Sequence, residues 1–218
     1  MKKVLFLLVL LSGSVILNAQ SDRYQKAMQQ NVIAVDTTRT MDGWRELANN
    51  FQRIADAEKT QWLPYYYAAM SHVMMGYNLA NGQLGGFADK TDPEADQAEQ
   101  LLNKAEALSK DNSEIYCIRK MIASLRLMAD PMNRYQEQLP LVAQSLEKAK
   151  ALDANNPRPF VLEAQDKFYT PEQYGGSKTE AKVLFEEALK KYETFKPASD
   201  IHPQWGKGQV QYFLSQLK

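Results

Sequence analysis

Side chains that could ligate a metal ion or act as nucleophiles are few and scattered in this sequence. The two histidines, His72 and His202, lie far apart, and neither has a second likely ligand at i, i+4 spacing. A His/Cys metal site is therefore not expected. The single cysteine, Cys117, has no base beside it in the sequence. We expect it to be a small packed thiol rather than a nucleophile.

Acidic residues and glycine-rich loops give no catalytic pattern either. Glu186 and Glu187 fall on a helix face that should be solvated, and no acid pair stands isolated among apolar residues, as glycoside hydrolysis would require. Neither Gly85-Gly86 nor Gly175-Gly176 follows a strand, so neither forms a phosphate-binding loop. The sequence therefore predicts a protein that is not an enzyme, with no catalytic residues, no metal and no cofactor.

The first nineteen residues have the order of a secretory signal peptide. Met1-Lys2-Lys3 is positive, Val4 to Ile16 is almost wholly apolar, and Ala19 offers a cleavage point. No cysteine follows the apolar run, which disfavours a lipid anchor, and an uncleaved membrane anchor is the alternative. We predict a signal peptide over 1–19 and one mature domain over 20–218, located in the periplasm or secreted and without a membrane span.

The charge balance argues against a nucleic-acid partner. The 218 residues include 26 basic and 26 acidic side chains. Loss of Lys2 and Lys3 with the signal peptide leaves 24 basic and 26 acidic residues, a formal charge of −2. Such a chain lacks the basic surface that phosphate backbones require. A single cysteine permits no intramolecular disulfide, so stability must come from apolar burial.

The pattern of apolar residues beyond the signal peptide is helical throughout. Apolar residues recur at three- and four-residue spacing, and no stretch alternates as a half-buried strand would. The predicted helices are 22–35, 41–58, 62–80, 93–109, 113–129, 132–151, 158–168, 177–194 and 204–217. Asp92-Pro93 and Asp130-Pro131 each place a capping side chain before a proline at the first helical position. The fold class is all-α.

Four helices share a spacing of small residues followed by an aromatic residue. The second small residue is Ala55, Ala105, Ala149 or Ala188, and the aromatic residue that follows is Tyr66, Tyr116, Phe160 or Trp205 respectively. In the first three copies the aromatic residue lies eleven positions after the alanine, and in the fourth it lies six positions further on. Small residues at such positions let neighbouring helices approach closely.

This pattern resembles the tetratricopeptide repeat. The resemblance implies a right-handed superhelix of antiparallel helix pairs, about four pairs followed by a terminal helix. The four alanines are 50, 44 and 39 residues apart, against a family period of about 34, so the loops are longer than usual.

The resemblance also implies which positions face the concave side, where members of the family bind partners. Carried onto this sequence, the candidate binding residues are Tyr67, Ser71, Met74, Met121, Ser124, Gln165 and Phe168. Chaperone-binding members place lysine and asparagine at the first of these positions to hold a carboxylate, and their absence here disfavours that activity. The implied surface is apolar and rich in methionine, which suits varied apolar partners.

Two interpretations of this surface remain open. The side chains could line an open groove, or they could pack against one another and against helix 22–35. The leading functional hypothesis is an adaptor that binds a protein or peptide. The alternative is a protein that binds an apolar small molecule or assists its transport. An adaptor would expose a contiguous apolar patch, whereas a ligand-binding protein would enclose a concavity of roughly 300–1,000 Å³.

Overall fold

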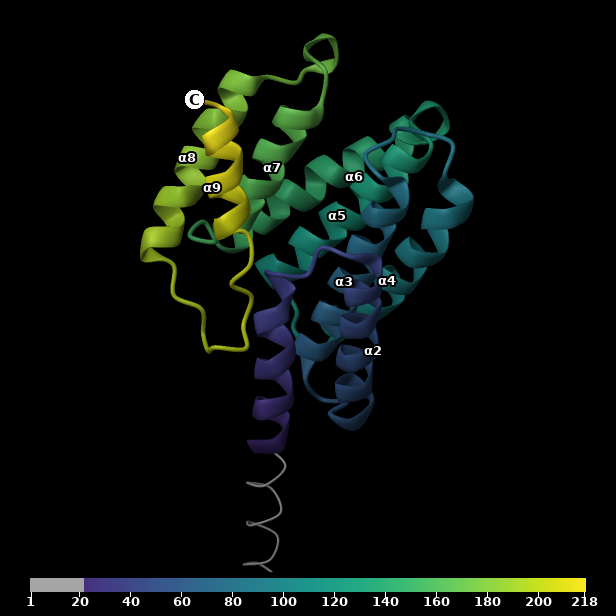
Figure 1. Cartoon of the computed structure of the whole chain (residues 1–218), viewed down its shortest axis with the longest axis vertical. Coiled ribbons are helices and arrows are strands. Elements are labelled where there is room, and N and C mark those ends of the chain that lie inside the picture. The colour runs from purple at the N-terminus through teal and green to yellow at the C-terminus, as the bar shows by residue number, and fades with distance from the viewer. Residues whose placement is uncertain (1–21) are drawn as a thin grey trace, which may run out of the picture.

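The computed structural model describes residues 22–218, and every regular element in that range is helical (Figure 1). The helices are 22–35, α2 (Met41–Ala57), α3 (Trp62–Ala80), α4 (Ala88–Leu108), α5 (Ser113–Ala129), α6 (Pro131–Leu152), α7 (Arg158–Tyr169), the 3₁₀ turn η1 (Glu172–Tyr174), α8 (Lys178–Thr194) and α9 (Lys207–Gln216). The all-α prediction is confirmed for these residues. None of their helices is both long and apolar enough to cross a membrane. The predicted signal peptide lies outside the described residues.

Capping side chains explain several helix starts. The side chain of Thr40 accepts a hydrogen bond from the backbone N–H of Gly43 at the start of α2. Asn112 caps α5 in the same way, at 2.9 Å from the N–H of Glu114, and Ser177 caps α8. Pro131 occupies the first position of α6, as its sequence predicts, but the predicted cap by the Asp130 side chain was wrong, because that carboxylate accepts hydrogen bonds from the Asn133 side chain instead. Each cap satisfies an N–H group that has no partner within its own helix.

Helix α4 begins five residues earlier than the sequence indicated. The prediction placed Asp92 as its cap and Pro93 at its first position, and this was wrong because α4 starts at Ala88 with Pro93 inside it. Asp92 instead accepts two hydrogen bonds of 2.7 Å from the guanidinium of Arg134 on α6. That bidentate ion pair uses the carboxylate that capping would otherwise need.

Consecutive helices pack against one another along the chain, and Figure 1 shows α5 and α6 side by side and running in opposite directions. Ala55, Ala105, Ala149 and Ala188 are all fully buried at these contacts. Because alanine has no side-chain atoms beyond Cβ, these positions allow the helix axes to come close. Whether the array is a tetratricopeptide superhelix stays a prediction.

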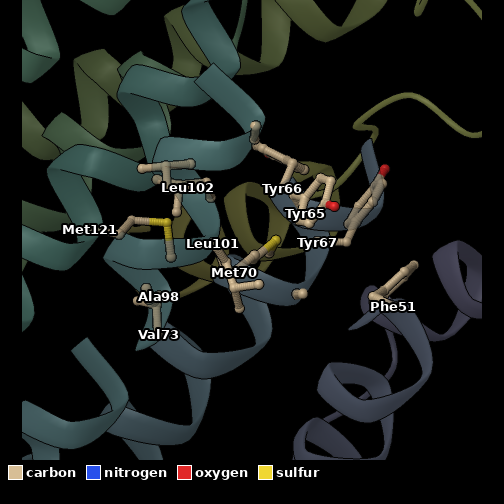
Figure 2. Close-up of a cluster of buried hydrophobic side chains, with 14 of the residues drawn as sticks. Phe51, Tyr65, Tyr66, Tyr67, Met70, Val73, Ala98, Leu101, Leu102 and Met121 are labelled. Atoms are coloured by element: carbon tan, nitrogen blue, oxygen red, sulfur yellow. The ribbon is translucent and has the colours of Figure 1, made fainter. Parts of the chain in front are cut away.

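The larger of two main cores is centred on α3, which is apolar on nearly every face. Figure 2 shows Val73 of α3, Ala98 of α4 and Met121 of α5 together in this core. The hydroxyls of Tyr65, Tyr66 and Tyr67 donate hydrogen bonds to Ala55, Glu114 and Ile201. Without these acceptors each buried hydroxyl would cost about 1–3 kcal/mol. The second core joins α7, α8 and α9 around Phe185.

Residues 195–206, here called the crossing loop, pack the C-terminal part of the chain against its N-terminal part. This loop runs from α8 to α9 and contacts the N-terminal part of the chain (Figure 1). Ile201 and Trp205 are buried in the larger core. The Trp205 indole N–H donates to the Tyr66 hydroxyl at 2.8 Å, and Gln29 donates to Asp200. Helix α9 therefore starts at Lys207 rather than at 204, because Trp205 is held in the loop.

Candidate functional site

Groups that could do chemistry are engaged in structural contacts. His72 lies 2.6 Å from a carboxylate oxygen of Glu94, and His202 lies 2.8 Å from the Ser199 hydroxyl. Burial, and then the charge of Glu114, raises the pKa of the Cys117 thiol well above its usual value, so the thiol stays protonated. Within residues 22–218 no group of three or more His, Cys, Asp and Glu side chains could hold a metal ion.

An ion pair with both partners buried joins Glu114 of α5 and Arg158 of α7. Arg158 donates from Nε at 2.7 Å, and also from Nη2, to the Glu114 carboxylate. Asn156 donates to the same carboxylate at 2.8 Å. The Arg158 guanidinium also lies 4.6 Å from the ring centroid of Phe195 and 5.8 Å from that of Trp205. This pair therefore helps to hold both ends of the crossing loop in place.

A cleft of about 320 Å³ lies between the N-terminal helices and the residues around the start of α9. Its apolar lining residues are Val35, Trp44, Met70, Met74 and Trp205, and its polar ones are Asp36, Thr38, Arg39, Asn78 and Gln209, together with Gly206 and Gly208. They come from the end of helix 22–35 and the loop after it, from α2 and α3, from the end of the crossing loop, and from the start of α9. Trp44, Met70 and Trp205 are 2%, 5% and 5% exposed, so they form the packed apolar floor of the cleft, and Met74 is more exposed. Such a floor suits a flat apolar ligand.

A second and larger depression, of about 690 Å³, is a solvated helix face rather than a site. All the residues that line it belong to α2 and all are polar, among them Asp42, Arg45 and Arg53. A binding site needs walls from more than one side, and this surface has only one.

Only part of the predicted binding surface reaches this cleft. Met74 lines it, and Gln165 donates a hydrogen bond of 3.3 Å to Gln209, which also lines it. Both residues occupy first-helix positions that the tetratricopeptide resemblance assigned to the concave side. The structure thus brings together two of the predicted residues from helices α3 and α7.

The other predicted residues lie elsewhere. Tyr67, Ser71 and Met121 are 1%, 1% and 5% exposed. Tyr67 donates to Ile201 in the crossing loop, and Ser71 donates to the Tyr67 carbonyl. For these three, packing rather than an open groove describes the structure. The crossing loop covers α3 at Tyr67, and Met121 of α5 is part of the larger core. Ser124 is half-buried on α5. Phe168 packs in the second core, 4.9 Å from Phe213 between ring centroids.

A pair of exposed tyrosines lies along α7 and α9. Tyr169 and Tyr212 are 69% and 61% exposed, and their ring centroids lie 5.8 and 5.5 Å from that of Phe213. Tyr169 is one turn beyond Gln165 and Tyr212 is one turn beyond Gln209, so each shares a helix face with a residue at the cleft. Partial burial, and then the neighbouring Tyr212, raises the pKa of Tyr169.

The sequence prediction missed Arg39, Trp44, Trp205 and the tyrosine pair. Tyr169 carried a signal, because it lies four residues after the predicted Gln165 and so on the same helix face. Trp205 was predicted only as a packing residue. Arg39 and Trp44 gave no signal in the sequence, since only the tertiary fold brings them close to α9.

Comparison with known proteins gives one informative match. No family model matches this chain, and neither does any curated protein sequence. Among solved structures, the HusA haemophore from Porphyromonas gingivalis is similar with a TM-score of 0.75 and 32% sequence identity. The match covers 89% of this chain and 92% of that chain. This chain belongs to the same family as HusA.

The likeness to HusA extends over most of this chain, because the match covers 89% of it. The tetratricopeptide resemblance is not tested by the match to HusA.

Proposed function

We propose that this protein binds haem, or a closely related tetrapyrrole, in the cleft between α3 and α9, and that it acts as a carrier rather than as an enzyme. The observation that carries the proposal is the set of Trp44, Met70, Met74 and Trp205 around one cleft, in a chain whose family includes a haemophore. The predicted signal peptide supports capture of the ligand outside the cytoplasm.

The residues present fit such a ligand. A tetrapyrrole is a flat ring with two apolar faces, and tryptophan and methionine pack well against such faces. The cleft volume of about 320 Å³ is at the lower end of the range of small-molecule sites. A macrocycle seated there would extend along Gln165 and Gln209 toward Tyr169 and Tyr212. Met74 is the residue in the cleft lining whose thioether would contact the iron, whereas Tyr169 and Tyr212 lie outside that lining.

Titration of the mature chain, residues 20–218, with haemin tests this proposal. The matched variants are Met74→Lys in the cleft and Met132→Lys on the exposed face of α6. We expect saturable binding with a shifted Soret absorbance and quenched tryptophan fluorescence. Met74→Lys should weaken it at least about tenfold, or about 1.4 kcal/mol, because the lysine ammonium would have to be desolvated beneath the ring.

Met132→Lys should leave haemin affinity unchanged. If the wild-type chain shows no saturable binding, the proposed function is wrong. If both lysine variants bind as tightly as wild type, haemin binds elsewhere on the molecule.

The second candidate is the adaptor function, which one surface feature supports. Met132, Tyr135 and Leu139 are 84%, 52% and 53% exposed and share one face of α6. The loop with the exposed Leu84 lies beside them, since Gly85 donates to the Met128 carbonyl. Exposed apolar stripes of this kind are typical of protein-binding surfaces. A purified partner that binds wild type but not a Met132→Lys, Leu139→Lys double variant would support this function.

A further inference from the structure

Arg39 stands out among the cleft residues as the one cation that lines it. The guanidinium donates from Nη1 to the carbonyl of the adjacent Thr38 at 2.8 Å. It forms no ion pair with any of residues 22–218, whereas Arg45, Arg119, Arg126, Arg134 and Arg158 all pair with carboxylates. The remaining donors of Arg39 are therefore available to an acceptor within the cleft.

The start of α9 adds positive potential on the facing side. Gly206 precedes the first residue of α9 with a left-handed φ of 108°, and no side chain caps the helix there. A Cβ on Gly206 would meet the Tyr192 hydroxyl at 2.4 Å, whereas a Cβ on Gly208 would meet nothing within 4 Å. Gly206 and Gly208 both line the cleft, which therefore reaches the backbone of the first turn, where N–H groups favour an anion.

A carboxylate of the chain itself already occupies this end of the cleft. Asp36 lines the cleft next to Arg39 and interacts with the backbone N–H of Gly206. Partial burial raises the pKa of Asp36, while Gly206, Arg39 and Arg158 oppose that rise. The lining of the cleft thus combines Asp36 and Arg39 with the apolar side chains of Met70 and Met74.

We infer that Arg39 binds a carboxylate of the ligand and so selects tetrapyrroles whose propionate groups are free. The inference rests on the proposed function, because it assumes that the macrocycle lies in the cleft. A porphyrin has two apolar faces and a single edge with both propionates. That edge matches the end of the cleft that contains Arg39 and the start of α9. Asp36 competes with the propionate for the same positive groups and sets how tightly it is held.

The test compares haemin with its dimethyl ester, in which both carboxylates are neutral. The variants are Arg39→Gln and, as a matched control, Arg53→Gln on the solvated face of α2. We expect wild type to prefer haemin over the ester by at least about tenfold, the effect of one charge-assisted contact. Arg39→Gln should abolish that preference by weakening haemin alone. Arg53→Gln should retain it.

Asp36→Asn provides the reverse test. Asparagine keeps an oxygen acceptor for Gly206 but loses the competing charge, so haemin should bind more tightly and the ester should bind as before. Far-UV circular dichroism of each variant checks that the helices are intact.

Three outcomes would overturn the inference. Wild type could bind haemin and the ester equally, Arg39→Gln could match Arg53→Gln, or Arg39→Gln could weaken both ligands alike, which would mean that Arg39 acts through the fold. In all three, haemin binding and hence the proposed function stand. Failure of wild type to bind either compound would instead reject the proposed function itself.

Discussion

At the scale of single residues, the ion pair of Glu114 and Arg158 has the largest energetic consequence. Both side chains are buried, and Asn156 and Tyr66 donate further hydrogen bonds to the Glu114 carboxylate, whereas Nη1 of Arg158 has no hydrogen-bond partner within residues 22–218. Desolvating two such charges costs about as much as their attraction returns, so the pair adds little net stability. Removing only one partner is different, because the other charge then stays buried without compensation.

We therefore expect Arg158→Ala to destabilise the fold by about 3–5 kcal/mol in urea denaturation. The double variant Glu114→Gln, Arg158→Met should recover much of that loss, because both charges are gone and the volume is partly kept. Equal losses in the single and double variants would mean that packing, rather than the uncompensated charge, causes the effect.

At the scale of helices, close approach depends on positions without a side chain. Gly76 lies in the middle of α3, where a Cβ would meet Cδ2 of Leu125 on α5 at 2.3 Å. Glycine ordinarily weakens a helix by about 0.5–1 kcal/mol relative to alanine. Its presence in α3 is explained by the contact with α5, in the same way that the buried alanines explain the contacts of α2, α4, α6 and α8.

Gly76→Ala should consequently destabilise the protein, by about 1–3 kcal/mol, although alanine is the better helix former. Gly208→Ala in α9 is the control. A Cβ there has no atom within 4 Å, so that variant should gain up to about 1 kcal/mol. Urea midpoints of the ligand-free proteins measure both changes. A gain in both variants would show that α3 and α5 can move apart without cost.

At the scale of the whole molecule, the crossing loop supplies one side of the cleft. It brings Trp205 and Gly206 against α3 and against the loop after helix 22–35. His202 is part of this loop, and its ring lies 5.9 Å from the ring of Trp62. Burial lowers the pKa of His202 below its ordinary value of 6.5, although the charge of Glu114 opposes that change.

A folded-state pKa below the unfolded one means that the unfolded chain binds the proton more readily. The stability of the protein should therefore fall as the pH drops below about 6.5 and through the lowered pKa of His202. His202→Asn should lose less stability over the same interval. Urea midpoints at about pH 7.5 and pH 5.5 check this. Parallel losses in wild type and variant would assign the pH dependence to other groups.

The sequence by itself determined the helices and much of their packing. Capping by Asn112 and Ser177, and burial of the small residues Ala105 and Ala149, follow from neighbours a few positions away, because helical hydrogen bonds and caps are local. The start of α4 could not be predicted in this way. Its predicted cap, Asp92, forms an ion pair with Arg134, which is forty-two positions away in the sequence.

Only the tertiary structure decided the candidate site. Met74 and Gln165 were carried over from the tetratricopeptide resemblance and lie at the cleft. Tyr67 was carried over in the same way, but it is covered by the crossing loop. Arg39 and Gly206 are distant in the sequence and line one cleft because that loop folds back onto α3. The physical reason is that periodicity shows which face of a helix is apolar, whereas long-range packing decides whether that face is filled or left open to a ligand.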